Sequence, residues 1–193
     1  MPVIGIRAAA VVLGLAALPA SAPITALLGT VTARGKAAPD AVVWLDVAHP
    51  VKAATRSDAV LDQRNMQFYP HVLAVQVGTI VKFPNDDRVF HNVFSFHDGK
   101  KFNLGLYPVG AVQRVPFDLP GLSRVFCNIH PQMAAYVMVV DTPYFAVSDD
   151  AGRFEIRGLP IDTYVYHAWR PGASILTDSV VVEPGVALDI RWR

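Results

Sequence analysis

The sequence has little cysteine and little charge. Its 193 residues include one cysteine, and charged side chains make up only 17%, below the share typical of soluble domains. A single cysteine excludes an intramolecular disulfide framework and a zinc site made of cysteines alone. The 17 basic and 16 acidic side chains lack the basic excess of a nucleic-acid binder. The composition therefore predicts no nucleic-acid partner and raises the question of what Cys127 does.

The first segment lacks an apolar run long enough to span a membrane. Arg7 precedes the apolar run Ala8–Leu18, and the small residues Pro19–Ala22 follow it. This is the layout of a secretory signal, and the run is shorter than the about 20 residues of a membrane span. We expect residues 1–22 to be a signal peptide, with no membrane span left after its removal. We therefore expect export to the periplasm, with an uncleaved N-terminal membrane anchor as the alternative.

Helical periodicity is also lacking after the signal. Short β-branched and aromatic runs alternate with Gly, Pro, Asn and Asp, which predicts an all-β protein made of one or two sandwiches. Residues 57–66 are the one predicted short helix or irregular crossing. The expected strands are 41–47, 72–83 with a turn at 77–79, 89–96, 113–117, 124–127, 135–140, 154–157, 163–169, 179–182 and 187–192.

Phenylalanine is concentrated in the middle of the chain. All ten phenylalanines lie between Phe68 and Phe154, and eight of them lie between Phe68 and Phe126. Large aromatic side chains dominate the cores of small domains. Residues 61–142 are therefore predicted to form a compact unit with its own core.

Four residues of this unit carry metal-ligand chemistry. Cys127, His130 and Met133 form the pattern C-x2-H-x2-M, and His91 lies in an earlier predicted strand. Two imidazoles, a thiolate and a weak axial thioether are the ligands of a type 1, or blue, copper site. One loop can deliver three of these ligands, and an adjacent strand must supply the fourth. We expect one copper ion held by His91, Cys127, His130 and Met133.

At these residues the sequence resembles the cupredoxin family. The resemblance implies a Greek-key β-sandwich over residues 61–142, and the short ligand spacing is similar to that of amicyanin rather than plastocyanin or azurin. The fused arrangement also resembles exported plastocyanin-like proteins labelled as methylamine-utilisation proteins. The matching positions within residues 66–140 are Phe68, Pro70, Val77-Gly78-Thr79, Val81, Phe83, Asn85-Asp86, His91-Asn92-Val93, Phe102, Phe117, Pro120-Gly121 and the Cys-His-Met loop.

The resemblance also implies supporting roles around the metal. Asn92 is expected to hydrogen-bond across to the cysteine loop and hold the two ligand segments together. Pro131 is expected to stiffen the loop between His130 and Met133. His71 and His97 are expected to be structural or turn residues rather than ligands.

A second resemblance covers about 70 residues on either side of this unit. Residues 28–47 and 145–166 are similar to carboxypeptidase-regulatory-like, transthyretin-type β-sandwiches, with Asp149, Gly152 and Phe154 matching a D-x-x-G-x-F hairpin. This implies a small, discontinuous sandwich formed by 24–56 with 143–193. In the competing interpretation, Ala41–Val47 is the first strand of the cupredoxin unit.

The function expected from these motifs is transfer of single electrons in the periplasm. The partners would be transient redox proteins that bind an apolar patch around Pro131, Gln132 and Ala134, and the chain would be a monomer. We expect no enzymatic activity, because the sequence lacks the H-x-H pairs of multicopper oxidases. The alternatives are a copper carrier or buffer without electron transfer, and a structural or interaction module that has kept the fold.

Overall fold

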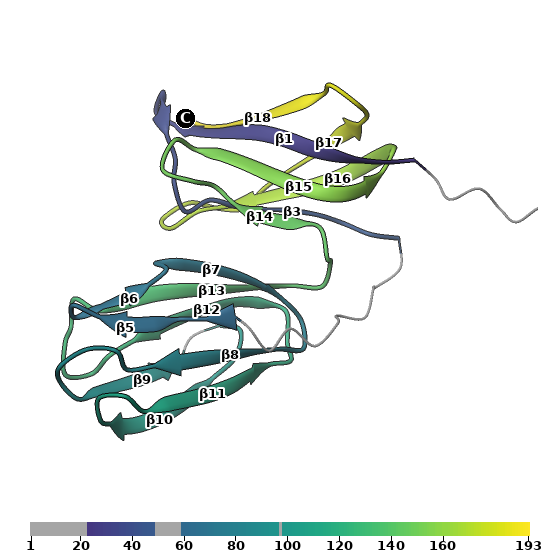
Figure 1. Ribbon diagram of the computed structural model, residues 1–193. Helices are drawn as coiled ribbons and strands as arrows, with labels where there is room; N and C mark the ends of the chain where they lie inside the picture. Colours follow the sequence, from purple (N-terminus) through teal and green to yellow (C-terminus); the bar gives the residue numbers. More distant parts are fainter. Residues whose placement is uncertain (1–22, 49–58, 97) are drawn as a thin grey trace, which may run out of the picture.

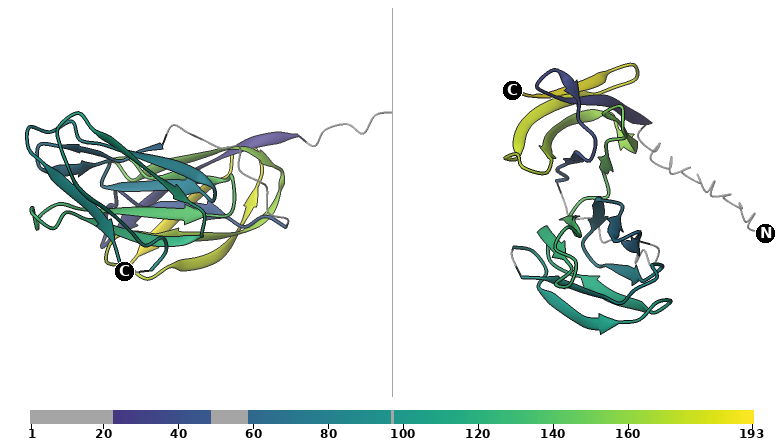
Figure 2. Two further views of the ribbon diagram at one scale, coloured as in Figure 1. Left: turned by 90° about the horizontal axis from the view of Figure 1, so that it is seen from below. Right: turned by 90° about the vertical axis from the view of Figure 1, so that its left-hand side faces the viewer.

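The computed structural model describes residues 23–48, 59–96 and 98–193, which fold into two stacked β-sandwiches (Figure 1, Figure 2). The described residues contain no helix, so the all-β prediction is confirmed. It follows that none of them forms a helix long and apolar enough to cross a membrane. The predicted signal peptide at 1–22 and His97 lie outside the described residues.

The central sandwich is built from ten consecutive strands. One sheet has the order β10-β9-β12-β13-β7, a second has the order β11-β8-β4, and β5 and β6 form a separate hairpin. The strands are β4 (Ala59–Val60), β5 (Asp62–Arg64), β6 (Gln67–Tyr69), β7 (Val72–Gln76), β8 (Thr79–Pro84), β9 (His91–Ser95), β10 (Phe102–Tyr107), β11 (Val112–Phe117), β12 (Gly121–Phe126) and β13 (Ala134–Val140).

Alternating side chains explain how these strands enclose a core. In β8, Thr79, Val81 and Phe83 are buried, while the residues between them are partly exposed, as expected for a strand with one face on a core. Phe83 and Phe117 come from the paired strands β8 and β11 and are fully buried. Burial of such aromatic side chains supplies much of the hydrophobic stabilisation.

The split sandwich is formed by strands from both ends of the described chain. One sheet has the order β15-β1-β18 with β2 paired to β1, and the other has the order β14-β3-β16-β17. The strand β3 pairs with β14 and β16, so it belongs to this sandwich and not to the central one. The strands are β1 (Ile24–Ala33), β2 (Lys36–Ala37), β3 (Val42–Leu45), β14 (Phe145–Val147), β15 (Arg153–Pro160), β16 (Asp162–Trp169), β17 (Leu176–Val182) and β18 (Ala187–Trp192).

An apolar layer joins the two sandwiches. Val42 and Trp169 of the split sandwich form a buried cluster with Val72, Met138 and Val140 of the central one. The ring of Tyr136 packs edge-on against Trp169, with centroids 5.3 Å apart. The outer faces of β7 and β13 are thus covered, so both faces of this part of the central sheet are buried.

Some local expectations differ from the structure. The segment predicted as a short helix or irregular crossing forms the strands β4 and β5 from residue 59 onward, and residues 57 and 58 lie outside the described part. Strands of two or three residues are too short for periodicity to identify. The strand β10 was not predicted, because Gly105 with φ of 68° interrupts its alternation. Met66 is 46% exposed in the turn between β5 and β6.

Candidate metal centre

The loop between β12 and β13 holds Cys127 and His130 in fixed positions. The backbone N–H of Met133 donates to the carbonyl oxygen of His130 at 2.9 Å, which closes a β-turn with Pro131 in its second position. Proline is favoured there because its fixed φ matches the turn. The N–H of Cys127 donates to the carbonyl oxygen of Met133 at 3.3 Å and closes the base of the loop.

His91 reaches this loop from the neighbouring strand. It begins β9, which pairs antiparallel with β12 through Phe94 and Phe126. The side chain of His91 is fully buried, and Cys127 is 4% exposed. His130 is only partly buried, so it is the imidazole of the cluster that reaches solvent.

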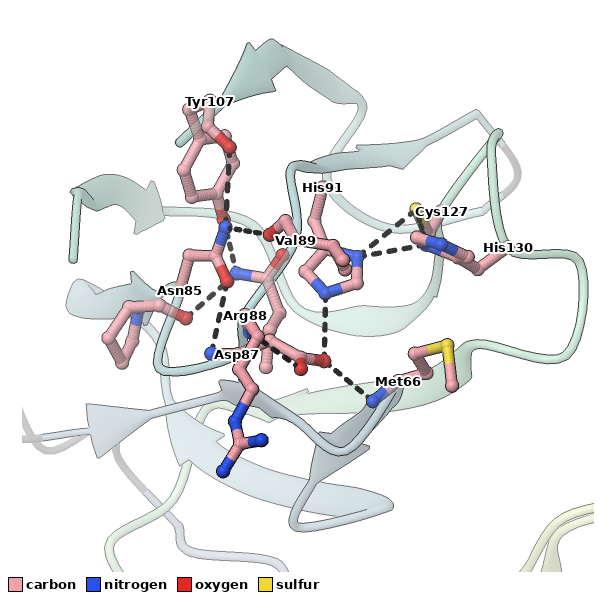
Figure 3. Close-up of polar contacts among 11 residues, drawn as sticks. Met66, Asn85, Asp87, Arg88, Val89, His91, Tyr107, Cys127 and His130 are labelled. Carbon is pink, nitrogen blue, oxygen red and sulfur yellow. Dashed lines mark hydrogen bonds and ion pairs between the residues drawn. The ribbon is translucent and has the colours of Figure 1, made fainter. Parts of the chain in front are cut away.

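Three donor atoms converge at this point (Figure 3). The Sγ of Cys127 lies 3.8 Å from Nδ1 of His91 and 3.7 Å from Nδ1 of His130, and the two Nδ1 atoms are 3.0 Å apart. A divalent transition metal with bonds of about 2.0 Å to nitrogen and about 2.3 Å to sulfur needs N···S separations of roughly 3.7 Å in a trigonal arrangement. The two observed N···S separations meet this requirement, so the three side chains fit a metal of this kind.

The other ring nitrogen of His91 is held by a carboxylate. Its Nε2 lies 3.0 Å from Oδ2 of Asp87, and the same oxygen accepts a hydrogen bond from the backbone N–H of Met66 at 2.6 Å. Partial burial opposes ionisation of Asp87, but the hydrogen bonds from Met66, Arg88 and His91 outweigh it and lower the pKa of this carboxyl. The carboxylate therefore accepts the Nε2 proton of His91, which leaves Nδ1 free as a metal ligand.

Hydrogen bonds fix the loop that carries Asp87. Asn85 is fully buried, and its amide donates to the carbonyl oxygens of Val89 at 2.9 Å and Tyr107 at 3.3 Å. The hydroxyl of Tyr107 donates to the carbonyl oxygen of Phe83 and accepts a short hydrogen bond from Gln63. These bonds anchor the loop to three strands and set the position of Asp87 beneath His91 (Figure 3).

The structure brings three of the predicted ligands together but gives Asn92 a hydrogen-bond partner other than the one expected. His91, Cys127 and His130 are brought together, while Met133 is buried in the same apolar cluster as Cys127 at the end of the loop. Asn92 does not hydrogen-bond to the cysteine loop as expected. Its amide donates instead to Oδ1 of Asn103 at 2.9 Å. Asn103 lies on β10, which pairs with β9 on the side opposite β12.

Sequence reasoning assigned no role to Asp87. The available signal was an acidic side chain four residues before His91, in the polar run Asn85-Asp86-Asp87. A carboxylate is a common partner for the second nitrogen of a metal-binding histidine.

Exposed apolar side chains gather on the segments around this cluster. Phe90 directly precedes His91, Leu106 is paired with Asn92 across β9 and β10, and Ile129 directly precedes His130. Phe90 is 52% exposed, Leu106 is 62% exposed and Ile129 is 48% exposed. We call these three exposed side chains, which lie on segments that adjoin the donor cluster, the apolar rim.

No protein-family model matches the sequence, and no curated protein is significantly similar to it. Several solved structures are similar in fold. A purple cupredoxin from Nitrosopumilus maritimus is 28% identical over 43% of this chain and 100% of that protein, with a TM-score of 0.40. A copper-containing nitrite reductase from Thermus scotoductus SA-01 is 27% identical over 50% of this chain and 25% of that one, with a TM-score of 0.43.

A Cu(I) form of an amicyanin variant is 24% identical over 51% of this chain and 98% of that protein, with a TM-score of 0.40. The matched share is about half of this chain in each case. The solved structures to which this chain is similar are cupredoxins, the family that its sequence motifs predicted.

Proposed function

We propose that this chain is an exported type 1 copper protein that carries single electrons between redox proteins. The convergence of the Cys127 thiol with the Nδ1 atoms of His91 and His130 is the observation that carries this proposal. A thiolate with two imidazoles is the donor set of blue copper sites. One copper ion bound there would alternate between Cu(II) and Cu(I) and transform no substrate.

The residues around the cluster suit this role. Cys127 would supply the thiolate, His91 and His130 the imidazole nitrogens, and Met133 an axial thioether. Two of the three converging donors are buried and tied by backbone hydrogen bonds and by Asp87. Such a rigid set of donors changes little when the metal changes charge, which favours electron transfer over copper delivery.

His130 and the apolar rim support transient docking. The partly exposed imidazole of His130 would be the exit for electrons, and Phe90, Leu106 and Ile129 are exposed apolar side chains on the segments that adjoin the cluster. Weak electron-transfer encounters use small interfaces. A partner would therefore bind here briefly, in the periplasm that the predicted signal peptide implies.

Copper loading tests the proposal. The purified chain is titrated with Cu(II), its visible absorption is recorded, and its reduction is followed by voltammetry. We expect an intense blue or purple thiolate-to-copper absorption and a reversible one-electron couple. Cys127→Ser should abolish the absorption, because the hydroxyl does not replace a thiolate as a copper ligand.

A matched variant separates loss of the ligand from loss of the fold. Ser123 is a buried residue of β12 outside the donor cluster, and Ser123→Ala should retain the coloured site. A colourless copper adduct in the wild-type protein would favour copper storage, and no copper uptake would favour a structural module. Either result would overturn the electron-transfer proposal.

A further inference from the structure

A cavity lies in the split sandwich and has a volume of about 750 Å³. It is lined by the β1–β2 hairpin at residues 33–37, by the loop that follows β16, and by the C-terminal residues 192 and 193. The backbone N–H of Arg34 donates to the carbonyl oxygen of Trp192 at 3.0 Å and joins two of these segments. Figure 1 shows the C-terminal end beside this hairpin.

The side-chain charges of this cavity are of one sign. Its lining includes the four cations Arg34, Lys36, Arg170 and Arg193 and no acidic side chain. Within the described ranges, no ion pair or side-chain hydrogen bond is formed by any of the four. Other arginines of the same sandwich are paired, as Arg153 is with Asp149. Repulsion among unpaired like charges makes an anion in this cavity favourable.

Arg170 is the one of these four cations that is partly buried. Its Nε is buried and has no hydrogen-bond partner among the described residues. Leaving a buried donor of a charged group unpaired is costly. Arg170 lines the cavity, and its planar guanidinium matches the spacing of phosphate or carboxylate oxygens, so this side chain is suited to an oxyanion.

The remaining lining is suited to an organic group. Trp192 and Leu176 lie beside the cations. The indole N–H of Trp192 donates to the carbonyl oxygen of Ser174 at 3.4 Å, which orients the ring. The cavity volume lies within the range of about 300–1,000 Å³ found for small-molecule sites, and it exceeds what a bare inorganic anion needs.

We propose that this cavity binds a phosphate ester, with the cations taking the phosphate oxygens and Trp192 contacting the organic group. The ester could be a free small molecule or a phospholipid headgroup, because both present the same chemistry. The site is separate from the donor cluster of His91, Cys127 and His130, since none of these residues lines the cavity. The proposal therefore stands independently of electron transfer.

The test uses phenyl phosphate as the probe, titrated calorimetrically into the full chain at low ionic strength. Arg170→Gln and Lys36→Gln should each weaken binding about tenfold or more, the effect of losing a charge-assisted hydrogen bond. Arg114→Gln is the matched control, because Arg114 is exposed on β11 of the central sandwich. It should leave binding unchanged. Lys36 is exposed, so its replacement is not expected to disturb folding.

Vesicle binding distinguishes a free phosphate ester from a phospholipid headgroup. Sedimentation with phosphatidylglycerol vesicles, lost in Arg170→Gln and absent with phosphatidylcholine, would assign the headgroup. Binding of phenyl phosphate without vesicle binding would assign a free ester. The proposal is wrong if neither probe binds, or if Arg114→Gln weakens binding as much as Arg170→Gln does.

Discussion

His91 shows how the surroundings of one side chain prepare it for a metal. Its Nδ1 faces Cys127 and His130, while its Nε2 is held by Asp87 at 3.0 Å. A neutral imidazole has one protonated and one free nitrogen, and a hydrogen bond to one nitrogen determines which is which. The carboxylate therefore selects the ring form in which Nδ1 can bind a metal.

Replacing Asp87 tests this arrangement. Asp87→Asn removes the negative charge, so we expect copper affinity to fall by about 10–100-fold. The reduction potential should rise, because the lost anion stabilised the more highly charged Cu(II). A chelator-competition titration and voltammetry measure the two effects.

The adjacent exposed Asp86 provides the control. No hydrogen bond joins it to His91, so Asp86→Asn should change copper affinity much less. Equal affinities of Asp87→Asn and wild-type protein would contradict the role given to Asp87.

The hairpin between β14 and β15 ties the two sheets of the split sandwich together. Gly152 has φ of 75°, its N–H donates to the carbonyl oxygen of Asp149 at 2.8 Å, and its own carbonyl oxygen accepts the N–H of Val31 at 2.7 Å. The hairpin thus packs directly on β1. This close approach explains why glycine follows the aspartate in the D-x-x-G pattern.

Gly152→Ala should destabilise the split sandwich. The left-handed backbone costs a non-glycine residue roughly 1–2 kcal/mol. The new Cβ would also overlap the carbonyl oxygen of Val31, which adds roughly 1–3 kcal/mol. Urea unfolding measures the loss. Gly185 has φ of 87° and open space around it, so Gly185→Ala should lose only the first contribution, and equal losses would contradict the overlap.

Acid should weaken the same hairpin. Hydrogen bonds from the backbone N–H and then the side chain of Arg153 lower the pKa of Asp149. Its stabilising contribution is therefore present above the unfolded pKa of about 4 and is lost as the pH falls through the lower folded pKa. Asp149→Asn should melt below wild type at pH 7, and the difference should shrink as the pH approaches 2. Asp150 is exposed, and for Asp150→Asn the difference in melting temperature from wild type should not shrink in this way as the pH falls.

The two sandwiches meet through a small apolar layer centred on Trp169. This side chain is 6% exposed and contacts Tyr136 of the central sandwich. The polar contact between Nδ1 of His71 and Oδ2 of Asp40, at 2.8 Å, also crosses the boundary. Surface pairs of this kind contribute little, so the apolar contacts dominate the coupling of the two sandwiches.

Trp169→Ala should uncouple them. Removing a buried tryptophan costs about 3–5 kcal/mol, and calorimetry should then resolve two thermal transitions instead of one. The absorption of copper-loaded protein should be unchanged, because Trp169 is not among the converging donors. Val181→Ala, at an exposed site on β17, is the control. A single transition with unchanged midpoint in Trp169→Ala would contradict this coupling.

Much of the fold was predictable because its signals are local. Alternating apolar residues and turn residues located most strands, such as β13 and β16, within a few positions. Among the strands outside the predicted runs, β2, β4, β5, β6 and β14 have only two or three residues, and β1 and β10 are interrupted by a glycine. The donor cluster was predicted from the residue types of His91, Cys127 and His130 and from the short spacing between Cys127 and His130.

The amino-acid sequence alone was enough to identify the all-β class and to predict the ligand loop and the candidate metal, because each depends on residue type and short spacing. Only the folded chain could place Asp87 under His91, turn Asn92 toward Asn103, and gather Arg34, Arg170 and Arg193 around one cavity. These contacts depend on which strands become neighbours and on how their loops meet. Long-range pairing settles both, and no short pattern of residues encodes it.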